Sequence, residues 1–430
     1  MSETFYSDLE ARGIVKQVTE PKLGPLLDSK PLVLYAGFDP TSDSLHLGSL
    51  LPLLTLRRFQ NAGHTPIAVV GGATGMIGDP SGKTQERQLL SPEILERNLV
   101  GISKSISKFL DSSGKNPVRI VNNYDWFKGM DYLAFLRDVG KHFTVNHMMA
   151  KDSVRSRLED REHGISYTEF SYMLLQAYDF QVLNQKHGCA LQIGGSDQWG
   201  NITAGCELIR RMAAASGKEA PEVFGLTHPL VMKADGTKFG KTEKGNIWLD
   251  PTKTSPYQFY QFFIQTSDAD VVQYLKYFTF LPLSEISRLE EATKKEPEKR
   301  EAQRTLAQDL TKLVHGDDAL GKVEQATQAL FGAGIKDLDA KTLKDVFADA
   351  PATEFPKARL GALPLVDLLA ETGLCASKGA ARKDVTSGGI YLNNERASDP
   401  MAQVSTEHLI AGRFVVLRKG KKTYHLASFL

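Results

Sequence analysis

Cysteine and excess charge are both scarce in this chain of 430 residues. The cysteines lie far apart, at positions 189, 206 and 375, which excludes the closely spaced ligands of a structural zinc site and a disulfide framework. The formal net charge of +1 predicts no general attraction to nucleic acid, so any nucleic-acid surface must be local. No apolar run is as long as a membrane-spanning helix, and no signal-peptide pattern opens the chain. These absences favour a cytoplasmic protein that does not bind membranes.

What is present is an alternation of short apolar runs and helical patterns in the first half of the chain. The runs at 32–38, 66–72, 118–123 and 189–195 are typical of buried parallel strands. We therefore predict an α/β domain with a Rossmann-like, doubly wound parallel sheet, in which ligands bind beyond the carboxyl ends of the strands.

The later parts of the chain have a different character. Apolar residues recur every three or four positions after about residue 254, the stretch around Pro351 and Pro356 has little periodicity, and a helical pattern followed by short strands closes the chain. We predict four segments: the α/β domain at 1–225, an α-helical domain at 226–335, a linker at 336–361 and a small α+β domain at 362–430.

The stretch "VLYAGFDPTSDSLHLGS" at 33–49 leads from a predicted strand into a helix. Pro52 is tolerated only in a first helical turn, so the helix is expected to begin near Ser49, a good N-cap. A helix N-terminus attracts anions, Gly48 permits close approach to the backbone, and Thr41 and His46 can donate to phosphate oxygens. The alternative is an ordinary turn with a solvated histidine.

A second glycine-rich stretch, "GGATGMIGDPSGKT" at 71–84, falls one residue short of a P-loop. Only three residues separate Gly78 from Gly82, where the P-loop pattern needs four. Three charged residues remain as candidates: Asp79 beyond a strand, with Lys83 and Arg87 able to share one helix face. The alternative is a charged surface loop.

Three polar residues of "YTEFSYMLLQAYDFQVL" share one helix face, namely Tyr172, Gln176 and Asp179. The segment is apolar nearly all round, which favours a buried helix facing a pocket over a solvated polar stripe. A buried Asp179 needs a partner, and a ligand hydroxyl or ammonium group can serve.

Two further stretches suit a nucleotide. In "LQIGGSDQWGN", Asp197 after a glycine pair can accept from a ribose hydroxyl, although Ser196 and Asp197 are also placed to cap a helix. In "KADGTKFGKT" at 233–242, Lys238 and Lys241 flank Gly240 in a basic loop that suits phosphate charge or is simply a surface turn.

In series, "YAGFDPT", "GDPSGKT", "QIGGSDQWGNI" and "KFGKT" resemble the bacterial tyrosyl-tRNA synthetases, which are class I aminoacyl-tRNA synthetases. "HLGS" at 46–49 is similar to the family's HIGH signature and "KFGKT" at 238–242 to its KMSKS loop. The C-terminal piece resembles the S-four RNA-binding module. The resemblance implies that tyrosine attacks the α-phosphate of ATP, and that the tyrosyl adenylate then acylates tRNA(Tyr). It also places the helical domain on the anticodon side.

The resemblance implies a role for each site residue. The tyrosine site comprises Tyr35, Asp79, Tyr172, Gln176, Asp179 and Gln198. The ATP site comprises Gly37, Asp39, His46, Gly48, Ser49, Gly195, Asp197 and Lys241. The residues expected around the pyrophosphate are Thr41, His46, Lys83, Arg87, Lys238, Lys241 and Thr242. ATP with Mg²⁺ is the implied co-substrate, with no tightly bound cofactor and no resident metal.

Two basic clusters near the C-terminus predict a tRNA-binding surface. No Asp or Glu lies between Leu409 and Leu430. The predicted tRNA-binding residues are Lys378, Arg382, Lys383, Arg413, Arg418, Lys419, Lys421 and Lys422. The alternative is a solvated basic strand end. Family resemblance also suggests a homodimer formed through the α/β domain, for which residues 124–143 offer an amphipathic candidate.

The sequence departs from the family signatures at two positions. Ser49 replaces the second histidine of HIGH, and Gly240 stands where KMSKS has serine. Three alternatives stay open: a tryptophanyl-tRNA synthetase, a small-molecule nucleotidylyltransferase, and a non-catalytic RNA-binding protein derived from a synthetase. Tyr35 with Asp179 suits a phenol, which disfavours the first of them.

Overall fold

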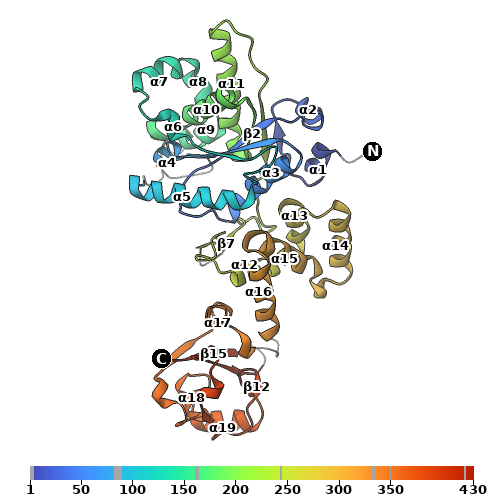
Figure 1. The fold of residues 1–430 in the computed structure, drawn as a ribbon, viewed down its shortest axis with the longest axis vertical. Helices are drawn as coiled ribbons and strands as arrows, with labels where there is room; N and C mark the ends of the chain where they lie inside the picture. The colour runs from blue at the N-terminus through green and yellow to red at the C-terminus, as the bar shows by residue number, and fades with distance from the viewer. Residues whose placement is uncertain are drawn as a thin grey trace. The chain divides into compact units, whose positions relative to one another are not determined.

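The computed structural model describes residues 4–81, 90–159, 164–242, 245–330, 335–348, 350–420 and 423–430 (Figure 1). The chain forms two compact units. The first comprises Met1–Lys253 with Ser267–Ala302, and the second comprises Thr254–Thr266 with Gln303–Leu430. The sequence predicted a boundary at 225, whereas residues 226–253 and 267–302 belong with the α/β part.

The first unit is built on a six-stranded sheet in the order β1 (Gln17–Val18), β6 (Phe224–His228), β5 (Cys189–Gly195), β2 (Val33–Phe38), β3 (Thr65–Val70), β4 (Arg119–Asn122). All neighbours run parallel except β1 and β6. The predicted doubly wound parallel sheet is confirmed, since β2 to β5 coincide with the four apolar runs. The chain order reverses between β2 and β5, and ligands bind at such a switch point in open α/β sheets.

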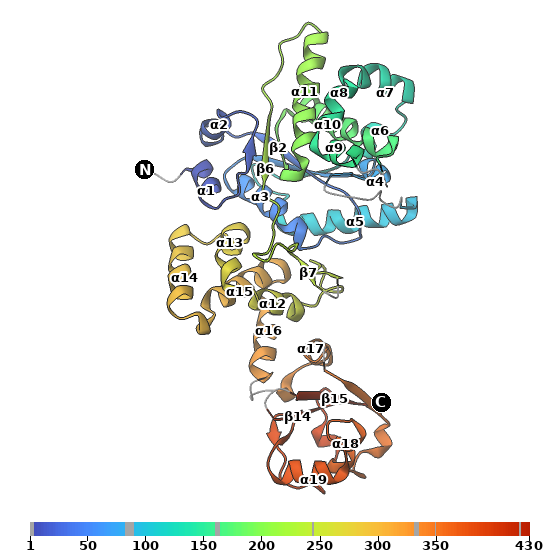
Figure 2. The same cartoon turned by 180° about the vertical axis from the view of Figure 1, so that it is seen from behind.

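Long helices cover both faces of this sheet. Helices α10 (Tyr167–His187) and α11 (Trp199–Ala215) lie on one face, and α3 (Leu50–Asn61) and α5 (Pro92–Phe109) lie on the other (Figure 2). Helix α10 begins where the Ser166 side chain accepts from the Glu169 backbone, and it ends at Gly188 in the left-handed conformation. The remaining helices of this unit are α1 (Phe5–Ala11), α2 (Leu23–Ser29), α4 (Thr74–Ile77), α6 (Tyr124–Phe127), α7 (Tyr132–Asp138), α8 (Val145–Met149), α9 (Asp152–Glu159), α13 (Asp268–Phe278) and α14 (Leu283–Lys295).

Contacts around α13 explain why the KFGKT stretch belongs to the first unit. Phe239 is buried and stacks on Phe278 of α13 with ring centroids 5.0 Å apart. Arg58, in the last turn of α3, donates to the Thr279 carbonyl at the C-terminal end of α13, where a cation is favoured. Burial lowers the pKa of Arg58 to about 9.

The second unit combines helices with a five-stranded sheet in the order β12 (Glu395–Arg396), β11 (Ile390–Leu392), β14 (Phe414–Lys419), β15 (Thr423–Phe429), β9 (Ala352–Phe355). A short ladder joins β10 (Leu363–Pro364) to β13 (Gln403–Val404). The helices are α12 (Pro256–Ile264), α16 (Asp317–Leu330), α17 (Ala340–Val346), α18 (Leu365–Glu371) and α19 (Lys378–Thr386), with α15 (Glu301–His315) beginning in the first unit. The predicted C-terminal α+β region is confirmed.

The segment 336–361, predicted as a linker, is largely folded. It contains α17 and β9, and β9 pairs in parallel with β15. Phe355 of β9 is buried and stacks on Phe429 with ring centroids 5.5 Å apart. The linker prediction is therefore wrong for 352–355, because a strand of four residues is too short to show periodicity and its partner lies far along the chain.

Candidate functional site

The HLGS turn lies directly before α3 and fixes the ring of His46. The backbone N–H of Gly48 donates to His46 Nδ1 at 3.0 Å, so the neutral ring carries its proton on Nε2. A Cβ atom on Gly48 would lie 2.7 Å from His46 Cε1, which explains the glycine. Helix α3 begins at Leu50 as expected, but Ser49 makes no capping hydrogen bond. The expected Ser49 cap is wrong, because His46 caps the 3₁₀ turn Leu47–Ser49 that precedes the helix.

The KFGKT loop meets the HLGS turn through backbone contacts. The Leu47 N–H donates to the Ile247 carbonyl at 2.9 Å, and the Ile247 N–H donates to the Gly240 carbonyl at 3.0 Å. The exposed Lys238 and Lys241 flank the buried Phe239 and Gly240. β7 (Lys241–Thr242) pairs with β8 (Gly245–Asn246). The structure therefore brings together two loops that are far apart in the sequence, one carrying the two lysines and the other carrying the histidine.

A chain of hydrogen bonds joins α10 to the ends of β2 and β3. Tyr172 Oη donates to Asp39 Oδ2 at 2.9 Å, and Thr74 Oγ1 donates to Asp39 Oδ1 at 2.8 Å. Asn123 Nδ2 donates both to Thr74 Oγ1 at 3.0 Å and to Asp179 Oδ2 at 3.1 Å. Burial, with the nearby Asp39, raises the pKa of Tyr172 well above its ordinary value, so this hydroxyl stays protonated and donates.

Asp179 is a buried carboxyl at the inner end of this chain of contacts. Trp126 Nε1 donates to its Oδ1 at 2.8 Å. Burial raises the pKa of Asp179 to about 8, against the lowering effect of the hydrogen bonds from Asn123 and Trp126. Tyr35 is also buried, and burial followed by the Asp179 charge raises its pKa well above the ordinary value. Within the described ranges its hydroxyl has no hydrogen-bond partner.

A second cluster of amides and carboxylates lies beyond β5. Gln198 Nε2 donates to Asp79 Oδ2 at 2.6 Å, and the Ser81 N–H donates to Asp79 Oδ1 at 2.9 Å. Asn201 Nδ2 donates to Gln176 Oε1 at 3.1 Å and to Gln198 Oε1 at 3.2 Å. The structure thus connects Asp79, Gln176 and Gln198, three predicted tyrosine-site residues from three different segments.

Asp197 lies in the 3₁₀ turn Ser196–Gln198 that follows β5. Burial, with the nearby Asp79, raises the pKa of Asp197. Neither this turn nor α11 has a side-chain cap, so the capping role considered for Ser196 and Asp197 is wrong. A Cβ atom on Gly195 would lie 2.4 Å from Asp197 Oδ1, so the glycine leaves space for this carboxylate.

The remaining predicted residues of the site are exposed or lie outside the described ranges. Thr41 and Gly37 are exposed, and a Cβ atom on Gly37 would meet no atom of the described residues within 4 Å. Lys83 and Arg87 lie outside the described residues.

Sequence reasoning missed the residues that hold the predicted ones in place. Thr74, Asn123, Trp126 and Asn201 all donate to predicted site residues or link them. Asn123 and Trp126 follow the end of β4, and the position of polar residues beyond a parallel strand is the signal that could have identified them.

In the C-terminal region, α19 and β14 carry five of the predicted basic residues, namely Lys378, Arg382, Lys383, Arg418 and Lys419. Lys419 of β14 forms an ion pair with Asp384 of α19 at 2.7 Å, which joins the two clusters. Arg418 lies over the ring of Tyr391 at 3.8 Å. Arg382 and Lys383 are exposed.

Two other predicted cations of this region have acidic partners. Lys378 pairs with Asp367 at 2.8 Å, and Arg413 lies 4.0 Å from Glu354. Lys421 and Lys422 lie outside the described residues.

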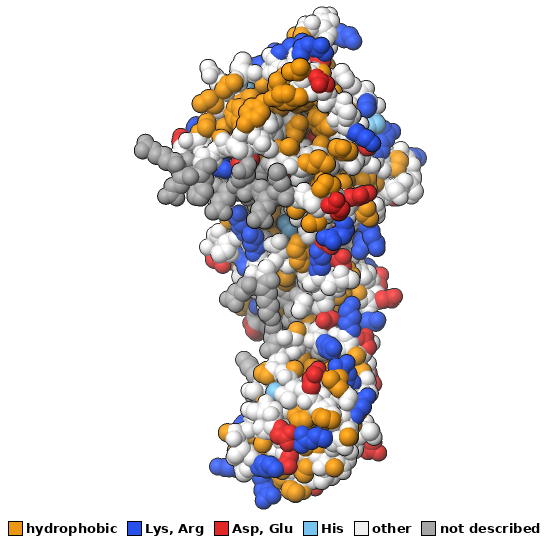
Figure 3. Space-filling model, turned by 90° about the vertical axis from the view of Figure 1, so that its left-hand side faces the viewer, with side chains coloured by type: hydrophobic (Ala, Val, Ile, Leu, Met, Phe, Trp, Pro, Cys, Tyr) orange, Lys and Arg blue, Asp and Glu red, His pale blue; other side chains and the backbone are white. Residues whose placement is uncertain are grey.

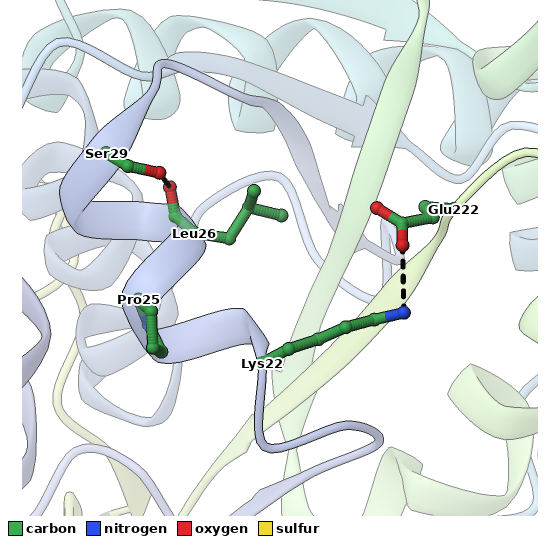
Figure 4. A pocket seen from close by; sticks show the side chains of 5 residues that line it. All are labelled: Lys22, Pro25, Leu26, Ser29 and Glu222. Carbon is green, nitrogen blue, oxygen red and sulfur yellow. Dashed lines mark hydrogen bonds and ion pairs between the residues drawn. The ribbon is translucent and has the colours of Figure 1, made fainter.

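A pocket of about 350 Å³ lies elsewhere on the first unit (Figure 4). It is lined by Lys22, Pro25, Leu26, Ser29 and Glu222, none of which was predicted for the site. In the parts of the chain that the structure describes, no cluster of His, Cys, Asp or Glu could hold a metal ion, and no helix is long and apolar enough to cross a membrane.

Comparison with known proteins defines the class. Residues 27–332 match the family model described as "tRNA synthetases class I (W and Y)". The chain belongs to this family of class I tRNA synthetases, as its sheet and signature motifs indicate. A C-terminally truncated mitochondrial tyrosyl-tRNA synthetase from Aspergillus nidulans has a similar structure, with a TM-score of 0.68 and 32% identity over 76% of this chain and 94% of that one.

The relatives also identify the branch of the family. Residues 342–427 match the C-terminal domain model of SYY-like tyrosine–tRNA ligases. The chain is 55% identical to the tyrosine–tRNA ligase of Geobacillus kaustophilus, over 98% of this chain and 99% of that relative. It is 54% identical to tyrosine–tRNA ligase 1 of Bacillus subtilis, over 98% of each chain. The predicted resemblance to the bacterial tyrosyl enzymes is confirmed.

Proposed function

We propose that this protein is a tyrosine–tRNA ligase, which activates L-tyrosine with ATP and transfers it to tRNA(Tyr). The observation that carries the proposal is the buried Asp179 carboxyl beside the Tyr35 hydroxyl. Burial of two polar groups is costly unless they have partners, and a phenol hydroxyl can both donate and accept at this position. The names of the close relatives support the same activity.

We assign the substrate tyrosine to the two clusters of hydrogen bonds. Asp179 and Tyr35 hold the phenol. Asp79, Tyr172 and Gln176 surround the ammonium group, since carboxylate, hydroxyl and amide oxygens all accept from it. Gln198, which contacts Asp79 at 2.6 Å, lies near the substrate carboxylate.

We assign ATP to the edge of the sheet between β2 and β5. Asp197 accepts from the ribose, and the predicted ATP site also includes Gly37, Asp39, His46, Gly48, Ser49 and Gly195. Since no neighbour among the described residues requires glycine at position 37, a ligand lying against the backbone explains that residue. ATP enters as its magnesium complex, with the ion carried by the phosphates.

We infer that no protein side chain acts as a nucleophile. A carboxylate oxygen of tyrosine attacks the α-phosphorus, the bond to the bridging oxygen breaks, and pyrophosphate leaves. The residues proposed around the pyrophosphate are Thr41, His46, Lys83, Arg87, Lys238, Lys241 and Thr242. They stabilise the charge that develops on the phosphates, so that catalysis is positioning plus electrostatic stabilisation. A ribose hydroxyl at the tRNA 3′ end then attacks the tyrosyl carbonyl and AMP leaves.

We propose that the C-terminal module binds tRNA through α19 and β14. The ion pair between Lys419 and Asp384 supports this proposal, because it holds the two basic clusters together. The exposed Arg382 and Lys383 are the best placed for phosphate contacts. Residues 1–253, which include the KFGKT loop, are assigned to catalysis, the helical stretch that follows up to residue 335 to the anticodon side, and residues 362–430 to RNA binding.

We further propose that the protein is a cytoplasmic homodimer. Large apolar side chains of α7 and α8 are exposed, with Leu133 at 72%, Tyr132 at 58% and Val145 at 58%. Figure 3 shows apolar side chains gathered on the side of the first unit where α7 lies in Figure 1. A second copy of the chain would cover such a patch, which is unusual on a monomer.

Amino-acid-dependent exchange of pyrophosphate into ATP, run against each of the twenty amino acids, tests the activity. We expect exchange with tyrosine and almost none with phenylalanine, because phenylalanine has no hydroxyl to pair with the buried Tyr35 hydroxyl and the Asp179 carboxyl. Exchange with tryptophan alone would identify the alternative tryptophanyl enzyme. No exchange with any amino acid would support a non-catalytic RNA-binding protein.

A further inference from the structure

We propose that Trp248 is a positioning residue for adenylate formation, which acts by holding the imidazole of His46. The inference rests on the proposed function, since it assigns a support to one of the residues around the pyrophosphate. Trp248 lies beyond the KFGKT hairpin and belongs to neither signature motif.

The contact between the two side chains is direct. The rings of His46 and Trp248 meet edge to face, with centroids 5.9 Å apart and an interplanar angle of 70°. Edge-to-face pairs have a preferred geometry, so Trp248 limits rotation of the imidazole. The Gly48 N–H holds Nδ1 of the same ring at 3.0 Å. The tryptophan and the backbone N–H together determine where Nε2 points.

Trp248 is in turn held from two sides. Its backbone lies in a short antiparallel ladder, in which Leu47 N–H donates to the Ile247 carbonyl and Leu249 N–H donates to the Leu45 carbonyl, both at 2.9 Å. Lys253 Nζ lies 4.6 Å from the centre of the Trp248 ring. The backbone of Trp248 is therefore held against residues 45–47, and its indole ring is held by Lys253.

The lysine is itself fixed by two residues that precede the HLGS turn. Lys253 forms an ion pair with Asp43 and lies 3.3 Å from Ser42 Oγ. The hydrogen bond from Lys253 lowers the pKa of Asp43, so the carboxylate remains charged at neutral pH. Residues 42–48 and 247–253 thus contact each other at several points. Trp248 links them, because its ring contacts both His46 and Lys253.

A tryptophan that positions His46 affects the rate of the chemical step more than substrate binding. A displacement of a catalytic group by about 1 Å can cost roughly 100-fold in rate. We expect Trp248→Leu to slow single-turnover formation of tyrosyl adenylate by roughly 10- to 100-fold. The Kd for tyrosine should change less than about twofold, because the described contacts of Trp248 are with His46 and Lys253, neither of which is assigned to the tyrosine site. Trp248→Phe keeps an aromatic ring and should recover most of the rate.

A double-mutant cycle with His46→Ala separates positioning from a general structural role. If Trp248 acts through the imidazole, Trp248→Leu should have little further effect once His46 is alanine. Phe280→Leu is the matched control. A cation, Arg58, also lies over its ring at 4.7 Å, and Arg58 is not one of the residues assigned to the site. This variant should leave the rate of adenylate formation unchanged.

Three results would overturn the inference while the wild-type protein still catalyses tyrosine-dependent exchange. They are an unchanged rate in Trp248→Leu, fully additive losses in the cycle, and a Trp248→Phe variant as slow as Trp248→Leu. The absence of exchange in the wild type would instead overturn the proposed function. In that case the shift of the His46 ring proton signals on Trp248→Leu substitution, measured by NMR, would still test the ring contact by itself.

Discussion

Replacing Asp179 with asparagine should remove a pH dependence from the stability of the first unit. Burial raises the pKa of this carboxyl from the ordinary 3.8 to about 8. Between these two values the folded protein holds a proton that the unfolded chain has released. A rise in pH therefore favours unfolding, and stability is lost progressively until the pH passes the folded pKa. Asparagine has the same shape and does not titrate.

The slope follows from the linkage of protonation to folding. One proton contributes about 1.4 kcal/mol per pH unit to the free energy of unfolding. The difference in stability between Asp179→Asn and wild type should therefore grow by about that amount per unit up to about pH 8, and then level off. Because all other titrating groups are common to both proteins, they cancel in the difference.

Urea unfolding followed by tryptophan fluorescence, at several pH values from 5 to 9, measures this difference. All three tryptophans of the chain lie within residues 1–253, so their emission reports on the first unit. Asp138→Asn is the matched control. Arg137 lowers the pKa of Asp138 through a hydrogen bond, so this carboxylate is charged at every pH of the series and its replacement should give a constant difference.

A constant difference for Asp179→Asn would refute the reasoning. It would mean that Asp179 is ionised in the folded protein at every pH of the series. The hydrogen bonds from Asn123 and Trp126 would then outweigh the cost of burial. The substrate phenol would meet a carboxylate rather than a carboxylic acid.

Three further substitutions test other parts of the molecule. Lys241→Ala should slow single-turnover adenylate formation roughly 100-fold without changing tyrosine binding. The reason is that the lysine meets the charge that develops as pyrophosphate leaves. An unchanged rate would contradict this role. Glu169 and Arg157 form an ion pair at 2.8 Å, and their side chains are 1% and 3% exposed, respectively. Glu169→Gln therefore leaves the buried Arg157 without its counter-charge. Urea unfolding should show a loss of about 3–5 kcal/mol, and a loss below about 1 kcal/mol would show that the pair is not needed. Lys383→Ala should reduce the steepness of the plot of log tRNA affinity against log salt concentration by about one unit, without changing pyrophosphate exchange. An unchanged slope would show that Lys383 does not contact the tRNA.

The strands and the buried helix of the first unit could be predicted because their signals are local. The continuous apolar runs of β2 to β5 mark strands that are covered on both faces. The burial of Asp179 followed from the apolar residues all round α10. In both cases the residues that carry the signal are the residues that form the element.

The supporting contacts could not be predicted in this way, because they join distant segments. Asn123 lies 56 positions before Asp179 in the sequence, and Trp126 lies 53 positions before it. Nothing near either residue in the sequence indicates that its partner is Asp179. For residues 124–143 the sequence indicated only an amphipathic candidate for a dimer interface. The buried pair of Glu169 and Arg157 is a further contact that the sequence analysis did not predict. Pairings of this kind are fixed by tertiary packing, on which local pattern is silent.

The glycine in KFGKT, Gly240, is a residue whose local conformation and tertiary contact both depend on its identity. Gly240 has a φ of 78°, a conformation that side chains other than glycine rarely adopt. A Cβ atom there would also lie 2.8 Å from Leu47 Cβ in the HLGS turn. The serine of the KMSKS signature therefore does not fit this arrangement of the two loops. In this protein the close approach of the KFGKT loop to Leu47 of the HLGS turn depends on the residue that departs from the signature.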